Sequence, residues 1–74
     1  MGRKIAIDVA GSSCVARAEY ERDRGVLRIR YTGGLIYDYQ HVPLETVEAL
    51  RASISKGQFV NAEIKPRFAY RRRA

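Results

Sequence analysis

Tyrosines and arginines recur at every second position in the middle of the chain, a spacing that can support stacking and ion pairing. Tyr37 and Tyr39 lie two residues apart, as do Arg28 and Arg30, so an extended backbone would place each pair on one face. Aromatic rings on a sheet can stack unpaired bases while neighbouring arginines hold phosphates. The alternative is that both rings pack in the core and keep only their hydroxyls near solvent. The spacing therefore indicates either a nucleic-acid surface or a tyrosine-rich core.

The positive charge of the chain is concentrated at its C-terminus. Of the net charge of +6, residues 15–64 contribute nothing, because seven basic and seven acidic side chains cancel there. Residues 65–74 contain no acid and carry five basic side chains, namely Lys65, Arg67, Arg71, Arg72 and Arg73. A basic arm of this kind can neutralise phosphates without reading base sequence. The alternative interpretation is a solubilising or disordered end.

The chain offers little for catalysis or metal binding. A zinc site needs three or four nitrogen, sulfur or carboxylate ligands, but the sequence has one histidine, His41, and one cysteine, Cys14. Ser12, Ser13 or Cys14 would need a nearby base to act as a nucleophile, and His41 ends a strand that is not expected to lie beside them. We therefore predict no catalytic residue, metal or cofactor. Cys14 is interpreted as a small buried strand residue and Ser12 as a partner for backbone groups.

These side chains would be positioned by three strands, predicted at residues 13–21, 26–31 and 35–40, where apolar and polar side chains alternate. Turns that end in glycine separate them. In the first strand the inner face is predicted to carry Cys14, Ala16, Ala18 and Tyr20. Its outer face is predicted to carry Val15, Arg17, Glu19 and Glu21.

The length of the second turn decides which side chains are neighbours. A three-residue loop pairs Ile29 with Tyr37 on one face and Arg28 with Asp38 on the other. A loop of two or four residues would instead put the tyrosines beside the arginines. We favour the three-residue loop because it gathers apolar side chains and pairs opposite charges. This register favours the core interpretation of the tyrosines over base stacking.

Helices are expected to follow the strands. Pro43 fits the first turn of a helix that ends between residues 53 and 57, and a second short helix is predicted from residue 58 to 65, before Pro66. Gly57 is expected to end the first helix, and Asn61 to fix the connection through hydrogen bonds. The side chains predicted to face the sheet are Leu44, Val47, Leu50 and Ile54. The predicted class is α+β, a three-stranded antiparallel β-meander followed by one or two short helices packed on one face.

Size and composition indicate one soluble domain. At 74 residues the chain is too short for two cores, so residues 1–74 are treated as a single domain with a basic tail at 65–74. The composition, 46% hydrophobic and 30% charged, is typical of a water-soluble globular protein. No apolar stretch approaches the roughly 18 residues of a membrane span. With its single cysteine, the chain is predicted to be cytoplasmic.

Several of these motifs, in their order along the chain, resemble the KTSC domain family. They are Ser12-Ser13, Leu27-x-Ile29-x-Tyr31, Tyr37-Asp38-Tyr39, Val42-Pro43 and Ser55-Lys56-Gly57-Gln58-Phe59-Val60-Asn61 followed by Ile64. The resemblance covers about residues 9–70, and Val60 stands where the family often has a second aromatic. The family is named for its occurrence at the C-terminus of some lysyl-tRNA synthetases and also occurs as free-standing small bacterial proteins. It has no established activity, and RNA binding has been suggested from the synthetase context.

Together these observations predict a small non-enzymatic domain that binds nucleic acid, RNA in particular, through its basic tail and a basic sheet surface. The predicted contacts are Arg17, Arg28, Arg30, Tyr37, Tyr39, Lys56, Lys65, Arg67, Arg71, Arg72 and Arg73. Glu19 and Asp38 are expected to cancel part of the basic sheet surface. The competing hypothesis is a protein-interaction or self-associating module that uses the face or edge of the sheet.

Overall fold

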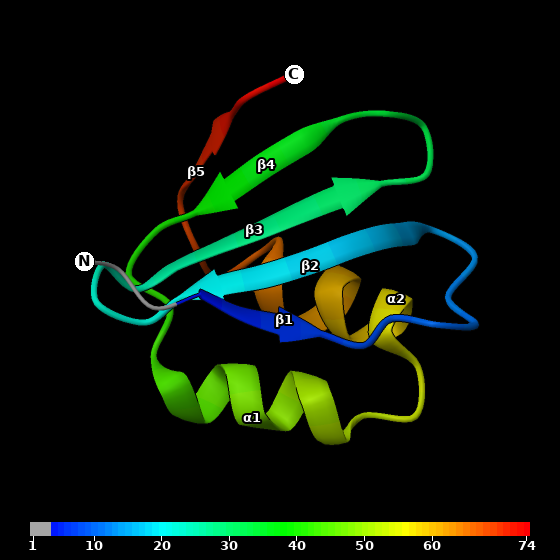
Figure 1. Cartoon of the computed structure of the whole chain (residues 1–74), viewed down its shortest axis with the longest axis horizontal. Helices are drawn as coiled ribbons and strands as arrows, with labels where there is room; N and C mark the ends of the chain where they lie inside the picture. Colours follow the sequence, from blue (N-terminus) through cyan, green and yellow to red (C-terminus); the bar gives the residue numbers. More distant parts are fainter. Residues whose placement is uncertain (1–3) are drawn as a thin grey trace.

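Residues 4–74, the part of the chain that the computed structural model describes, form an antiparallel sheet followed along the sequence by helices and a last strand (Figure 1). The five strands lie in the order β1-β2-β3-β4-β5. Their bounds are β1 Lys4–Ile7, β2 Val15–Glu21, β3 Val26–Tyr31, β4 Ile36–Tyr39 and β5 Tyr70–Arg72. The helical segments are α1 Leu44–Ala52, α2 Lys56–Phe59 and the π-helical turn η1 Val60–Ile64.

The predicted α+β class and antiparallel meander are confirmed, and β2, β3 and β4 are the three strands that the sequence predicts. The β3–β4 register is also the predicted one, because Ile29 lies opposite Tyr37 and Arg28 opposite Asp38. Gly34, at the end of the loop between these strands, has a φ of +99°, which glycine adopts without the steric cost other residues incur. The three-residue loop is therefore the turn that the sequence uses.

Two further strands widen the sheet beyond the prediction. β1 pairs with β2 and places Ile7 in the core, and β5 pairs with β4 at the opposite edge. β1 is only four residues long, and all three residues of β5 are exposed. Neither segment has enough buried side chains to show the alternation by which the inner strands are recognised.

A β-bulge at the start of β2 changes which side chains face the core. The β2–β3 register shifts between Val15 and Arg17, so Val15 is buried and Ala16 is exposed. The predicted faces of these two residues are therefore wrong, whereas Ala18 and Tyr20 face the core as predicted. Cys14 is half-buried and packs at the edge of the core.

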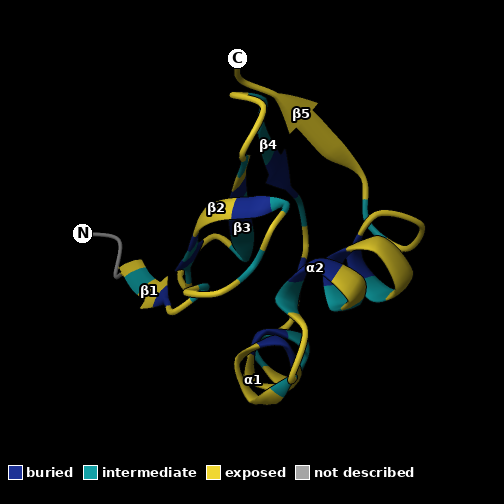
Figure 2. Ribbon diagram, turned by 90° about the vertical axis from the view of Figure 1, so that its right-hand side faces the viewer, coloured by how far each residue is buried: buried dark blue, intermediate teal, exposed yellow. Residues whose placement is uncertain are grey.

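The helices lie on one side of the sheet, and the core fills the space between (Figure 2). Its largest fully buried side chains come from both layers: Leu27, Ile29 and Tyr39 from the sheet, and Val47, Leu50, Val60 and Ile64 from the helices. The Tyr20 hydroxyl donates a 2.6 Å hydrogen bond to the Val42 carbonyl, which ties the segment before α1 to β2. None of the helices in residues 4–74 is long and apolar enough to cross a membrane.

The first helix ends earlier than its apolar pattern indicates. After Ala52 the chain turns to an extended backbone at Ser53, whose hydroxyl donates a 2.7 Å hydrogen bond to the Leu50 carbonyl. Ile54 consequently lies outside the helix and is fully exposed, so its predicted place against the sheet is wrong. Gly57 does not end a helix either, because α2 has already begun at Lys56 with Ser55 as its N-cap. Asn61 makes no side-chain hydrogen bond within residues 4–74.

Candidate nucleic-acid interface

Tyrosine side chains gather on the helix-facing side of β3, β4 and β5. Tyr39 lies directly opposite Tyr70, and the rings of Tyr37 and Tyr70 stack with centroids 4.6 Å apart and planes inclined by 24°. Tyr31 contacts Tyr37 edge-on at 5.6 Å. Burial differs sharply within the group, since Tyr39 is 0% exposed, Tyr37 and Tyr31 are half-buried and Tyr70 is 53% exposed. Tyr39 thus belongs to the core, whereas Tyr70 presents an aromatic ring to solvent.

The two inner tyrosines share a hydrogen bond through their hydroxyls. Tyr31 Oη and Tyr39 Oη are 2.8 Å apart. Burial, followed by this hydrogen bond, raises the pKa of the Tyr31 phenol, and burial raises the pKa of Tyr39. Burial therefore favours the protonated form of both phenols.

Positive charge flanks the tyrosines on the same side of the sheet. The Lys65 ammonium lies 4.9 Å from the centroid of the Tyr31 ring, within cation–π distance. Arg72 lies directly opposite Tyr37 in the β4–β5 pair, so its side chain leaves the sheet on the tyrosine side. We call this surface, formed by Tyr31, Tyr37, Tyr70, Lys65 and Arg72, the tyrosine edge.

The predicted basic tail is held in the sheet over part of its length. Tyr70–Arg72 pair with β4 as β5, and backbone hydrogen bonds continue on both sides, from Gln40 N to Ala69 O at 2.8 Å and from Ile36 N to Ala74 O at 3.2 Å. The interpretation of residues 65–74 as a disordered end is therefore wrong for residues 69–74. The strand also divides the arginines, because Arg71 leaves on the face opposite to Arg72.

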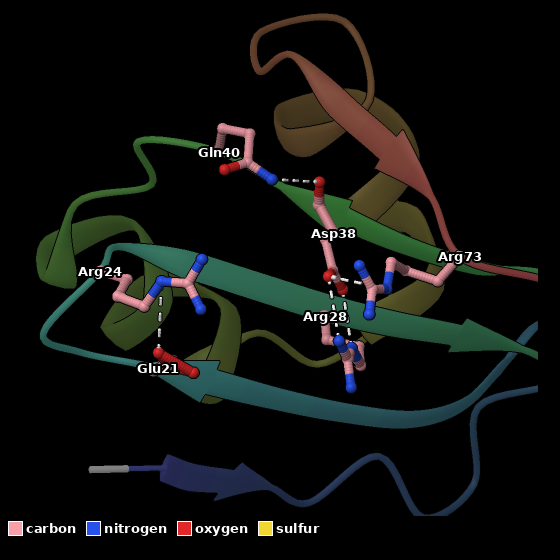
Figure 3. A network of polar contacts seen from close by, with 6 residues as sticks. All are labelled: Glu21, Arg24, Arg28, Asp38, Gln40 and Arg73. Atoms are coloured by element: carbon pink, nitrogen blue, oxygen red, sulfur yellow. Dashed lines mark hydrogen bonds and ion pairs between the residues drawn. The ribbon is translucent and has the colours of Figure 1, made fainter. Parts of the chain in front are cut away.

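On the outer face, away from the helices, Asp38 organises a network of arginines (Figure 3). Arg28 donates two hydrogen bonds to the Asp38 carboxylate, 2.7 Å from Nε and 3.0 Å from Nη2. The Arg73 guanidinium lies 3.6 Å from the same carboxylate. The hydrogen bonds from Arg28 lower the pKa of Asp38, against the effect of its burial, and raise the pKa of Arg28. Arg28 is thus held by Asp38 through two of its three guanidinium nitrogens.

The remainder of the outer face carries both signs of charge. Arg24 pairs with Glu21 at 3.6 Å, and a hollow of about 260 Å³ beside them is lined by Lys4, Glu19 and Arg71 among others. Arg17 and Arg30 lie on the same face. The outer face therefore has a mixed charge, and the exposed ring of Tyr70 lies on the other side of the sheet.

Comparison with known proteins assigns the chain to a family. Residues 11–68 match the KTSC domain. The chain belongs to the KTSC domain family. A protein of Tsukamurella paurometabola is 44% identical over 57 residues, which cover 77% of this chain and 85% of that protein. A protein of Stutzerimonas stutzeri is 33% identical over 55 residues, which cover 74% of this chain and 78% of that protein.

A solved structure extends the similarity to the whole fold. The crystal structure of a KTSC domain protein from Yersinia pestis matches with a TM-score of 0.84 at 26% sequence identity, covering 97% of this chain and 100% of that one. The resemblance indicated by the sequence motifs is therefore confirmed.

Two of the KTSC motifs that are far apart in the sequence line one groove. Its volume is about 560 Å³, and its lining includes Ser12, Ser13 and Cys14 from one segment and Ser55 and Asn61 from the other. The segments approach closely because residue 57 is a glycine: a Cβ atom there would collide with Cys14 Sγ. Ser12 Oγ accepts a 3.1 Å hydrogen bond from Val15 N, as its predicted structural role requires.

The predicted contact residues of this KTSC domain fall into separate places. Lys65 and Arg72 join Tyr37 at the tyrosine edge, whereas Arg17, Arg28 and Arg30 lie on the outer face with Arg71 and Arg73. Lys56 is apart from both, because its ammonium donates to the Arg51 and Ser53 carbonyls at 3.1 and 2.6 Å and so caps α1. Arg67 pairs with Glu63 at 3.1 Å.

Sequence reasoning missed Tyr70 and the pairing of its strand. Tyr70 follows Phe68 by two residues and precedes the arginines, an alternation that could have indicated a short strand. The signal is weak because no residue of β5 is buried. Within residues 4–74 no group of three His, Cys, Asp or Glu side chains is arranged to hold a metal ion.

Proposed function

We propose that this KTSC domain binds single-stranded nucleic acid, RNA in the first place, at the tyrosine edge. The observation that carries the proposal is Tyr70, a half-exposed ring held against Tyr37 on an edge strand rich in arginine. A base stacked on an aromatic side chain typically contributes about 1–3 kcal/mol. RNA is abundant in the cytoplasm, where the sequence predicts that this chain is located.

The position of Tyr70 favours stacking for two reasons. Its ring is already ordered by Tyr37 and by the backbone of β5, so little conformational entropy is lost when a base binds. Lys65 and Arg72 lie on the same side of the sheet and are exposed, so they offer cations to the phosphates of a bound strand. The tyrosines that fill the core, above all Tyr39, support this surface from below.

Fluorescence anisotropy with a labelled single-stranded oligoribonucleotide at low ionic strength tests the proposal. Tyr70→Ala should weaken the affinity about 5- to 150-fold, which corresponds to the loss of one stacked base. Tyr70→Phe keeps the ring and should bind within about twofold of the unchanged protein. Equal affinity of the alanine and phenylalanine variants would refute stacking on Tyr70.

Self-association is the second candidate, and the sheet topology provides its specific observation. β1 and β5 are the edges of the sheet, so each has backbone groups without a strand partner on one side within residues 4–74. A second copy could extend the sheet at either edge. Sedimentation velocity over a hundredfold range of concentration tests it, and a constant monomer mass would exclude a homodimer in that range.

A further inference from the structure

The outer face of the sheet contains one cross-strand pair of like charges. Arg17 on β2 lies directly opposite Arg30 on β3, and both side chains are exposed. Like charges directly opposite each other on neighbouring strands destabilise a sheet. Neither arginine makes an ion pair with any residue in the described range 4–74. Within residues 4–74 the repulsion between the two guanidinium groups is therefore not offset by an ion pair.

Everywhere else on this face the strand register brings opposite charges together. Each of the other directly opposed charged pairs consists of a cation and a carboxylate. These pairs are Lys4 with Glu21, Glu19 with Arg28, Arg28 with Asp38, and Asp38 with Arg71. Against this pattern, the uncompensated pair of arginines is the place on the outer face where an added anion would complete the charge pairing.

A small hollow lies at the pair. Its volume is about 130 Å³, and it is lined by both arginines together with Ile36, Glu19 and Arg28. Glu19 opposes an anion there, but the lining carries three arginines against this one carboxylate, and only Arg28 among them is paired with Asp38. Arg17 and Arg30 are left to act together.

We propose that Arg17 and Arg30 hold one phosphate group between them. The planar guanidinium group presents its N–H donors in a fork that matches phosphate oxygens, and two such groups can divide the oxygens of one phosphate. The phosphate could belong to a nucleic-acid backbone, in which case this site rests on the proposed function, or to a small phosphorylated molecule. The site lies on the face of the sheet opposite to the tyrosine edge.

The stability of the protein without ligand gives the first test. At low ionic strength in sodium chloride, Arg30→Gln should raise the melting temperature by about 1–5 °C, because it removes the repulsion between the two guanidinium groups. Arg22→Gln is the matched control, because Arg22 is exposed in the hairpin turn and lies five residues along the chain from Arg17. A rise that Arg22→Gln does not share supports the inference. No rise, or the same rise in both variants, contradicts it.

Titration with inorganic phosphate, followed through backbone amide resonances, gives the second test. The amides of Arg17 and Arg30 should shift to saturation, and sodium chloride at the same ionic strength should not reproduce the shift. Arg30→Gln should raise the dissociation constant for phosphate at least tenfold, whereas Arg22→Gln should change it by no more than about twofold. Equal phosphate affinity in the two variants would overturn the site.

Competition then identifies the source of the phosphate and separates this inference from the proposed function. If phosphate displaces a bound oligoribonucleotide more than sodium chloride does at the same ionic strength, the site serves the nucleic-acid backbone; if phosphate and the oligoribonucleotide bind together, it serves a small phosphorylated molecule. Phosphate binding that needs Arg30 without any RNA binding would leave this site standing and refute the proposed function. RNA binding that needs Tyr70, without any phosphate binding, would refute this phosphate site and leave the proposed function standing.

Discussion

Arg28 and Asp38, on neighbouring strands, are joined by two hydrogen bonds of 2.7 and 3.0 Å on the outer face of the sheet. Asp38 is 7% exposed, and its carboxylate also lies 3.6 Å from the Arg73 guanidinium. The pair links β3 to β4, and Arg73 brings in the chain that follows β5. Arg28 and Arg73 therefore stabilise the sheet through their contacts with Asp38.

Asp38→Asn should destabilise the fold by about 1–2 kcal/mol, because it leaves two guanidinium groups beside a neutral amide. Arg28 lowers the pKa of Asp38 in the folded protein, so the pair contributes stability above the unfolded pKa of about 3.9, and this contribution is lost as pH falls through the folded pKa. The difference in free energy of unfolding between the unchanged protein and Asp38→Asn should thus become smaller below about pH 4. Urea unfolding of both proteins at pH 3 and pH 7 measures it.

Arg24→Gln is the control for that experiment. Arg24 pairs with Glu21 at 3.6 Å but its side chain is 73% exposed, so its loss should cost no more than about 0.5 kcal/mol. A cost for Asp38→Asn as small as that of Arg24→Gln would show that the Asp38 network does not stabilise the sheet.

Gly57→Ala should destabilise the protein by about 1–3 kcal/mol, since the new methyl group would collide with Cys14 Sγ in the close approach of α2 to the segment before β2. Cys14→Ala removes the sulfur atom, so the same change at residue 57 should cost much less in that background. A double-mutant cycle from thermal unfolding measures the coupling. Additive effects of the two substitutions would contradict the packing described here.

Leu50→Ala and Ile54→Ala should differ widely in cost, although both residues belong to one apolar pattern. Leu50 is fully buried, so Leu50→Ala should lower the free energy of unfolding by about 2–4 kcal/mol. Ile54 is fully exposed, so Ile54→Ala should change it by less than about 0.5 kcal/mol. Denaturant unfolding at low temperature measures both. Similar losses would place Ile54 in the core and the end of α1 beyond Ala52.

The affinity for single-stranded RNA should fall with salt in proportion to the cations at the tyrosine edge. Contacts from Lys65 and Arg72 alone predict a slope of about −1.4 in a plot of log affinity against log salt, at about −0.7 for each phosphate. Lys65→Gln should reduce the slope by about 0.7, and Lys56→Gln, whose ammonium caps α1, should leave it unchanged. Equal slopes for all three proteins would remove Lys65 from the interface.

How far the sequence predicts this fold depends on how many buried side chains each segment has. The β3–β4 register follows from Ile29, Tyr37, Arg28 and Asp38, because only one loop length gathers the apolar side chains and pairs the charges. The bulge beside Val15 inserts a residue that no periodic pattern announces. The early end of α1 likewise leaves Ile54 at helical spacing but outside the helix.

The candidate site was partly predictable for the same reason. Tyr37 and the basic residues Lys65 and Arg72 stand out in the sequence. Tyr70, whose exposed ring stacks on Tyr37, lies on a strand that is defined only by its pairing with β4. Pairing between segments more than thirty residues apart is a tertiary event. Local propensity in three exposed residues does not indicate it.

Proton NMR of the tyrosine rings during a titration with a short single-stranded oligoribonucleotide tests the central claim most directly. The ring protons of Tyr70 should move upfield as a base stacks on them, those of Tyr37 less, and those of the fully buried Tyr39 hardly at all. Saturating shifts in this order at low ionic strength would agree with stacking at the tyrosine edge. Binding that leaves the Tyr70 ring unshifted, or no binding, would contradict it.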